Sequence, residues 1–127
     1  MKKTVLVLLV LVLAFSAFAQ SASETSNGIR VALLTDATGK DDKSFNAAAW
    51  RGIEQFYKGE GEGTLYQCIT AQSSDDYLPN LKNAAAQGYD LIITTGFTWG
   101  DAVEAFAKDY PNQKVIIVDV DYLTQVD

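Results

Sequence analysis

Short apolar runs alternate along this chain with longer stretches in which apolar residues recur at helical spacing. Four runs predict buried strands, at residues 29–34, 64–70, 90–94 and 114–118. Three amphipathic stretches between them predict helices, at residues 44–57, 75–87 and 99–108. Such alternation is typical of a parallel sheet with helices on both faces. The pattern therefore predicts an α/β fold with three layers.

Local signals support these boundaries. The Gly-rich segment KGEGEG stops the first helix, Gly88 ends the second, and Pro111 closes the third. Asp75 or Asp76 can cap the second helix at its start. In the first helix the helical spacing is carried by Phe45, Ala48, Ala49, Ile53 and Phe56.

Right-handed crossovers favour the strand order 2-1-3-4, with the first strand inside the sheet. The switch point of the topology then lies between the first and third strands. Ligands of open α/β sheets bind at the carboxyl ends of the strands. Residues that directly follow each strand are therefore the candidates for a binding site.

Carboxylates follow two of the four strands, Asp36 after the first and Asp119 after the fourth. An ionised carboxylate only accepts hydrogen bonds, so it suits the vicinal hydroxyls of a polyol. Each aspartate has an alternative role as a cap or turn residue of its loop. Asp41, Asp42 and Ser44 most simply cap the first helix.

Aromatic and amide groups lie beside these carboxylates in the predicted fold. Phe45 opens the first helix in the polar context DDKSFN, where it either packs on the core or offers its ring to a ligand. Asn46 can both donate and accept at the edge of a heterocycle. In the segment TTGFTWG, Gly96 permits close backbone approach and Phe97 adds a second ring, whereas Trp99 is expected to pack inside. The set favours an uncharged ligand with hydroxyls and a flat ring.

Composition narrows the classes of function. The chain has 127 residues, 16 acidic against 10 basic, and a net charge of −6, which argues against nucleic acid as a partner. It has no histidine and one cysteine, Cys68, so zinc sites, His-based triads and an internal disulfide are excluded. We expect Cys68 to be a buried structural thiol. Neither a P-loop nor a dinucleotide-binding glycine motif is present in the sequence.

The N-terminal 19 residues have the pattern of a Sec signal peptide. Lys2 and Lys3 precede an apolar stretch that ends in the cleavage motif Ala17-Phe18-Ala19. A transmembrane anchor is the alternative, but the stretch is short for a span. We therefore expect a signal peptide over 1–19, a flexible mature N-terminus over 20–28, an α/β lobe over 29–127, and export to the periplasm or cell surface.

The motif TDATGKDDKSFNAAAWRGI, followed by TTGFTWGDAVEAFAKDYPNQKVIIVDV, closely resembles the basic membrane protein family. These are solute-binding proteins of ABC transporters, similar to purine nucleoside receptor lipoproteins, and the resemblance covers 29 to about 120. It implies a type I periplasmic-binding fold of two lobes, with a small ligand in the cleft and an ABC permease as the membrane partner. It implies no cofactor, no metal and no catalytic residue.

The resemblance also implies roles for individual residues. Asp36 and Asp119 would hold ribose hydroxyls, and Phe45 would stack on one face of the purine. Asn46 would hydrogen-bond nearby, and Gly96–Phe97 would line the wall of the cleft.

Two departures from the family pattern change what is expected about membrane anchoring and about the completeness of the binding cleft. Members usually carry a lipidated Cys after the signal, but the sequence AFSAFAQSAS has none, which favours a free periplasmic protein. The chain also resembles only the N-terminal lobe, and the second lobe would supply the opposing aromatic residue. A half-site of this kind is expected to bind far more weakly than a closed cleft.

Three hypotheses about function follow. The leading one is the nucleoside-binding lobe of an exported solute receptor. The alternative is an extracytoplasmic sensory domain of the same lobe type in a signalling receptor. The third is a Mg²⁺-dependent phosphotransfer enzyme using Asp36, Asp41, Asp42 and Asp119. The predicted export and the lack of a lysine after the fourth strand disfavour this enzyme.

Overall fold

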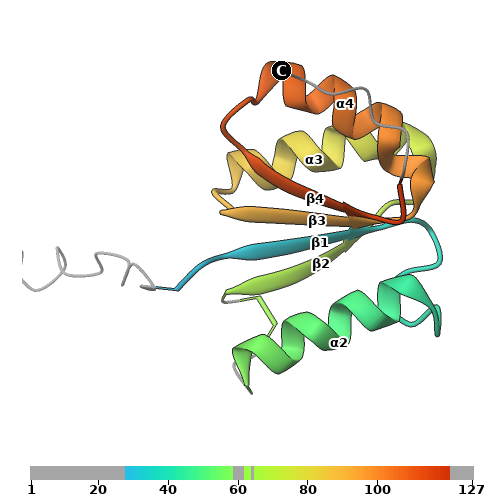
Figure 1. Cartoon of the computed structure of the whole chain (residues 1–127), viewed down its shortest axis with the longest axis vertical. Coiled ribbons are helices and arrows are strands. Elements are labelled where there is room, and N and C mark those ends of the chain that lie inside the picture. Colours follow the sequence, from blue (N-terminus) through green and yellow to red (C-terminus); the bar gives the residue numbers. More distant parts are fainter. Residues whose placement is uncertain (1–27, 59–61, 64, 121–127) are drawn as a thin grey trace, which may run out of the picture.

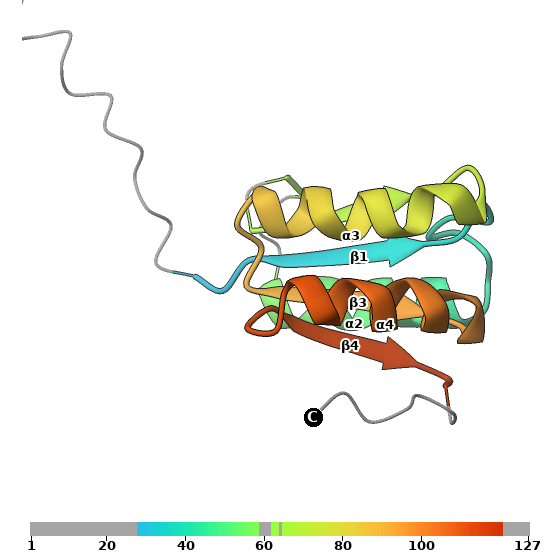
Figure 2. The same ribbon diagram turned by 90° about the horizontal axis from the view of Figure 1, so that it is seen from above.

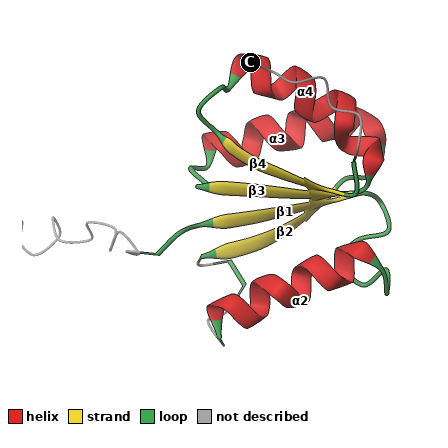
Figure 3. Ribbon diagram, viewed as in Figure 1, coloured by secondary structure: helices red, strands yellow, loops and turns green. Residues whose placement is uncertain are grey.

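A computed structural model describes residues 28–58, 62–63 and 65–120 of the chain. Its centre is a parallel four-stranded sheet in the order β2-β1-β3-β4 (Figures 1 and 3). The strands are β1 (Val31–Thr35), β2 (Tyr66–Thr70), β3 (Leu91–Thr95) and β4 (Lys114–Val118). The predicted α/β class and the predicted strand order are both confirmed. The predicted signal peptide lies outside the described residues, as does nearly all of the predicted flexible N-terminus.

Helices cover both faces of the sheet. Helix α2 (Phe45–Tyr57) lies on one face, whereas α3 (Tyr77–Ala86) and α4 (Gly100–Asp109) lie side by side on the other (Figures 1 and 2). Two short 3₁₀ turns, η1 (Ser74–Asp76) and η2 (Phe97–Trp99), precede α3 and α4. No helix within the described ranges is long and apolar enough to cross a membrane.

Several boundaries differ from the prediction by one or two residues. Strand β1 begins at Val31 rather than at residue 29. One reason is that the backbone N–H of Arg30 donates to the carboxylate of Asp90 at 2.7 Å, not to a strand carbonyl. The third helix starts one residue later than predicted, because Trp99 is the last residue of η2 and regular α-helix begins at Gly100.

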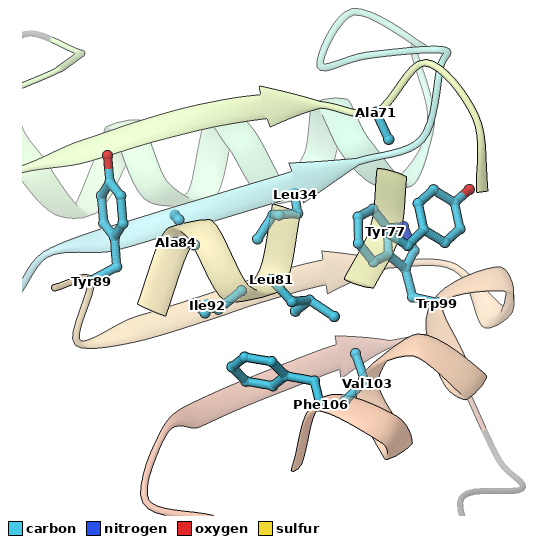
Figure 4. Close-up of a cluster of buried hydrophobic side chains, with 11 residues drawn as sticks. Leu34, Ala71, Tyr77, Leu81, Ala84, Tyr89, Ile92, Trp99, Val103 and Phe106 are labelled. Atoms are coloured by element: carbon cyan, nitrogen blue, oxygen red, sulfur yellow. The ribbon is translucent and has the colours of Figure 1, made fainter. Parts of the chain in front are cut away.

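The core between the sheet and α3/α4 is fully enclosed. Leu34, Leu81, Ile92, Trp99 and Phe106 are completely buried there (Figure 4). The indole of Trp99 stacks on the ring of Tyr77, with centroids 3.9 Å apart. Trp99 is therefore a core residue, as the sequence predicted.

The core between the sheet and α2 is smaller. Trp50, Ile53 and Tyr57 face the sheet, and the Tyr57 ring stacks on Tyr66 at 4.8 Å. The apolar spacing predicted the helix correctly, but its buried face is set by these residues. Phe45 and Phe56, at the two ends of α2, are 52% and 66% exposed. The aromatic contacts to β2 fix this rotation of the helix.

The structure corrects the burial predicted for Cys68. The thiol is only partly buried, not enclosed in the core. Its position on β2 still removes enough solvent that desolvation raises the pKa of the Cys68 thiol. A thiol with a raised pKa holds less of the reactive thiolate, so a structural role for Cys68 is unchanged.

Candidate ligand-binding site

The parallel register brings the carboxyl ends of the four strands to one edge of the sheet. Thr35 of β1 pairs with Thr70 of β2, and Thr95 of β3 pairs with Val118 of β4. The residues that follow these strands therefore emerge along the same edge. The topology thus brings together the strand-end loops from which the site residues were predicted.

Asp36 has one carboxylate oxygen fixed by the protein. Its Oδ1 accepts hydrogen bonds from the backbone N–H of Thr38 at 3.1 Å, from the Thr38 hydroxyl, and from the Asn46 side-chain amide at 3.1 Å. No hydrogen bond to Oδ2 is found among the residues that the structure describes. Asp36 therefore performs the turn-forming role open to it, and retains a second oxygen that can accept from a ligand.

Asn46 lies beneath the loop and is only 3% exposed. Its Nδ2 lies within hydrogen-bonding distance of Asp36 Oδ1, of Thr38 Oγ1 at 3.2 Å and of the Gly39 carbonyl at 3.0 Å. Its Oδ1 accepts a hydrogen bond from the hydroxyl of Thr95. The amide thus has protein partners on both sides, and its predicted contact with a ligand stays a prediction.

Asp42 caps helix α2. Its carboxylate accepts backbone N–H groups of Ser44 at 2.8 Å, Ala47 at 2.9 Å and Asn46 at 3.3 Å. Partial desolvation acts to raise the Asp42 pKa, but these three donors outweigh it, so the pKa lies below its ordinary value. The Ser44 side chain makes no capping bond, so Asp42 carries the role predicted for the acidic cluster.

Two aromatic rings are exposed near this edge. Phe45 is the first residue of α2, and Phe97, 61% exposed, is the first residue of η2. A ring that is more than half exposed contributes little to a core, so the packing alternative for Phe45 does not describe this structure. Both rings remain candidates for stacking on a ligand.

Gly96 and Asp119 turn the chain at the ends of β3 and β4. Gly96 has a φ of 94°, a conformation that other residues rarely adopt, and its N–H donates to the Val118 carbonyl at 2.8 Å. Asp119, with a φ of 69°, is a non-glycine residue in the left-handed region and is exposed. The bond from Gly96 ties the two strand ends together.

Sequence reasoning missed a group of threonines at the same edge. Thr35, Thr70 and Thr95 end three of the strands, and the hydroxyl of Thr35 donates to that of Thr70 at 3.1 Å. Thr38 in the following loop contacts both Asp36 and Asn46. The predicted strands end at Leu34, Thr70, Thr94 and Val118, so the group becomes apparent only with the observed strand ends.

A polar hollow of about 280 Å³ adjoins the loop on the β2 side. The Lys40 ammonium spans part of it, with its Nζ 2.7 Å from Glu62 Oε2 and 4.4 Å from the ring centre of Trp50. The hydrogen bond to Glu62 raises the pKa of Lys40, so this residue is cationic at neutral pH. Its positive charge is already paired with a carboxylate.

The described residues contain no cluster of three or more Cys, Asp or Glu side chains that could hold a metal ion. Of the four aspartates considered for Mg²⁺, Asp42 accepts hydrogen bonds from backbone N–H groups, and Asp36 accepts them, within the described part of the chain, through Oδ1 only. These donors compete with a cation for the oxygens of Asp42 and for Oδ1 of Asp36. The described edge of the sheet offers hydrogen-bond acceptors and aromatic rings.

A parallel α/β unit with candidate ligand-binding residues at its strand ends is also present in solute-binding proteins of ABC transporters. The family described as "ABC transporter substrate-binding protein PnrA-like" matches residues 29–124. The chain belongs to this family, which confirms the resemblance drawn from the sequence.

Individual relatives agree with this assignment. The chain is 36% identical over 101 residues to the "ABC transporter nucleoside-binding protein BmpA" of Lactococcus lactis subsp. cremoris, covering 78% of this chain and 29% of the relative. It is 31% identical over 122 residues to "Basic membrane protein A" of Borreliella burgdorferi, covering 96% and 35%. The chain thus spans about a third or less of these relatives.

A solved structure supports the fold. The ABC transporter solute-binding protein of Aeropyrum pernix K1 superposes with a TM-score of 0.65 at 32% identity, over 79% of this chain and 27% of that one. The three-layer unit therefore has the fold of part of a solute-binding protein.

Proposed function

We propose that this chain is the ligand-binding lobe of an exported solute-binding protein, and that its strand-end edge binds a purine nucleoside. Asp36 and Asp119 would accept hydrogen bonds from ribose, while Phe45 stacks on the base and Gly96–Phe97 borders it. The ligand would be enclosed between this lobe and a second one and delivered to an ABC permease.

The observation that carries this proposal is the pairing of an oriented carboxylate with exposed aromatic rings. Asp36 Oδ1 is held by two neighbouring residues, which leaves Oδ2 as an acceptor at the edge where Phe45 and Phe97 are exposed. A sugar hydroxyl needs such an acceptor, and a purine ring needs such a face. The nucleoside-binding relative from Lactococcus lactis supports the same ligand class.

The start of helix α2 favours a nucleoside over a nucleotide. Helix N-termini bind phosphate through their free backbone N–H groups. Here the N–H groups of Ser44, Asn46 and Ala47 already donate to the carboxylate of Asp42. A phosphate at this position would meet a negative charge and few free donors, so an uncharged ligand fits better.

Binding of this kind requires no covalent chemistry. The capture step depends on the fit of the ring and the hydroxyls, and release depends on separation of the two lobes. A single lobe covers one side of a ligand only, whereas small-molecule sites usually enclose most of the ligand surface. The affinity of this chain by itself is therefore expected to be weak.

Titration of the isotope-labelled protein with inosine, guanosine and adenosine, followed by NMR, tests the proposal. Amide signals of Phe45, Gly96 and Phe97 should shift, while signals of Lys82 and Asp109, which form an ion pair between α3 and α4, should not. Adenosine monophosphate should bind no better than adenosine. Absence of shifts at this edge with any nucleoside at millimolar concentration would reject the ligand class.

A matched pair of variants assigns the stacking ring. Phe45→Ala should weaken nucleoside binding by about 1–3 kcal/mol, the usual value of one base–aromatic stack. Phe56→Ala is the control, because Phe56 is also more than half exposed but lies at the other end of α2. Equal affinities for the two variants would remove Phe45 from the site.

A further inference from the structure

The buried amide of Asn46 connects the loop after β1 to the end of β3. On one side Nδ2 reaches the carboxylate of Asp36, and on the other Oδ1 accepts from the hydroxyl of Thr95. Asn46 and Thr95 are both almost fully buried, so water does not compete strongly for these bonds. Thr95 is thereby coupled to Asp36, although the two residues belong to different segments of the chain.

The surroundings of Asn46 determine which way its amide points. The Asp36 carboxylate and the Gly39 carbonyl can only accept hydrogen bonds, so they require the NH₂ group on their side. The amide oxygen must then face Thr95, whose hydroxyl serves as the donor. The Thr95 hydroxyl therefore completes the set of partners that orients the amide.

We propose that Asn46 and Thr95 are positioning residues for the carboxylate of Asp36. Asn46 holds Oδ1 together with Thr38, and Thr95 orients the amide of Asn46, which leaves Oδ2 as the oxygen that accepts from a ligand hydroxyl. This proposal rests on the proposed function, because it assigns how the nucleoside-binding edge is organised. It also means that Asp36 would contact the ribose hydroxyls through one carboxylate oxygen rather than through both.

Thr94 provides a matched control within the same strand. It precedes Thr95, is fully buried, and its hydroxyl has no hydrogen-bond partner among the described residues. Thr94 and Thr95 point to opposite faces of the sheet, since side chains alternate along a strand. Thr→Val at either position changes the same atoms, but only at Thr95 does it remove a donor from the Asp36 network.

The test compares two ligands on the full chain and its Thr95→Val, Thr94→Val and Thr95→Ser variants. Inosine carries sugar hydroxyls, whereas 2′,3′-dideoxyinosine lacks the vicinal pair. Thr95→Val should weaken inosine binding by about tenfold, because the hydrogen bond between a ribose hydroxyl and the charged Asp36 carboxylate would be lost or weakened. It should leave dideoxyinosine binding unchanged. Thr95→Ser keeps the hydroxyl and should bind both as the unmodified protein does, as should Thr94→Val.

A double variant sharpens the assignment. If Thr95 acts through Asp36, then Thr95→Val should add no further loss of inosine affinity to Asp36→Asn, because coupled residues are not additive. Equal weakening of both ligands by Thr95→Val, or full additivity with Asp36→Asn, would overturn the positioning role. If the unmodified protein binds neither compound, the proposed function itself fails, which is a distinguishable result.

Discussion

The two faces of the sheet differ in how completely they are covered. On the α3/α4 face, residues of the sheet and of both helices are buried, including Leu81, Ile92 and Phe106 (Figure 4). On the α2 face, a single helix packs on β1 and β3, with its aromatic rings against Tyr66 of β2, and leaves Ile116 and Val118 of β4 exposed. There an apolar hollow of about 410 Å³ is lined by Ile29, Val31, Ala49, Gly52, Ile53, Phe56, Tyr57, Leu91, Ile93, Ile116 and Val118.

Strand order explains this asymmetry. The chain moves from β1 to β2 in one direction across the sheet, then returns past β1 to β3 and on to β4. Because parallel crossovers are right-handed, a reversal of direction moves the connecting helix to the opposite face. One crossover therefore places α2 alone on its face, and two crossovers place α3 and α4 together on the other. Strand order and crossover handedness therefore set how many of the described helices lie on each face of the sheet.

The largest expected effect compares adjacent residues of β3. Ile92 is fully buried against α3 and α4, whereas Ile93 packs partly against the α2 face. Ile92→Ala should lower the free energy of unfolding by about 2–5 kcal/mol, and Ile93→Ala by about 1–2 kcal/mol. Urea denaturation measures both values. Equal losses would show that the α2 face is as tightly packed as the other.

The second effect concerns helix α2, whose N-terminus is capped by Asp42. Because the Asp42 pKa is lowered in the folded state, its capping contribution is complete above the ordinary pKa of 3.8 and is lost as the pH falls through the folded value. The protein should therefore lose stability below about pH 4.

The matched variant for this acid effect is Asp42→Asn, which keeps an acceptor oxygen but cannot titrate. Its melting temperature should change less between pH 6 and pH 3 than that of the unmodified protein, as followed by circular dichroism. Asp41→Asn is the control, because Asp41 is exposed and makes no such cap. Identical pH profiles for all three proteins would contradict the capping role of Asp42.

A smaller effect of opposite sign is expected on the α3/α4 face. The buried hydroxyl of Thr94 has no partner in the described part of the chain, and an unpaired buried polar group destabilises a fold. Thr94→Val has the same shape and should raise the free energy of unfolding by up to about 1 kcal/mol. A loss of stability on urea denaturation would show that this hydroxyl has a partner in solution.

The smallest effect on stability is expected at the open hollow. Ile116 is 48% exposed on β4, so Ile116→Thr should change the free energy of unfolding by only about 0.5 kcal/mol. The same variant should reduce the fluorescence of a bound hydrophobic dye, because it removes apolar surface from the hollow. Unchanged dye fluorescence would mean that this face is covered in solution.

The fold was predictable to a large extent from the sequence. Each strand stands out as an apolar run, and the predicted range 114–118 agrees with β4 at both ends. The rotation of α2 was less accessible, because Phe45 and Phe56 fit a helical stripe as well as Trp50 and Tyr57 do. The rings of Trp50 and Tyr57 contact Tyr66 of β2, a residue whose position depends on the whole sheet.

The candidate site was predictable in its location but not in its internal contacts. Asp36, Gly96 and Asp119 follow strands, so their shared edge comes from the topology. The burial of Asn46 beneath Asp36 had no local signal, and Thr95 lies 49 residues away from it. Neither contact can be predicted from the sequence, because both depend on the packing of α2 beside the end of β3.

The elements, their order in the sheet and the edge at which strand-end residues gather can be inferred from the sequence pattern. Periodicity and chain handedness act locally, so they can be read from neighbouring residues. The tertiary structure was needed to establish which rings are exposed, how tightly each face is packed and which oxygen of Asp36 is held. Those features depend on packing between segments distant in the chain, where burial and hydrogen-bond partners are settled together.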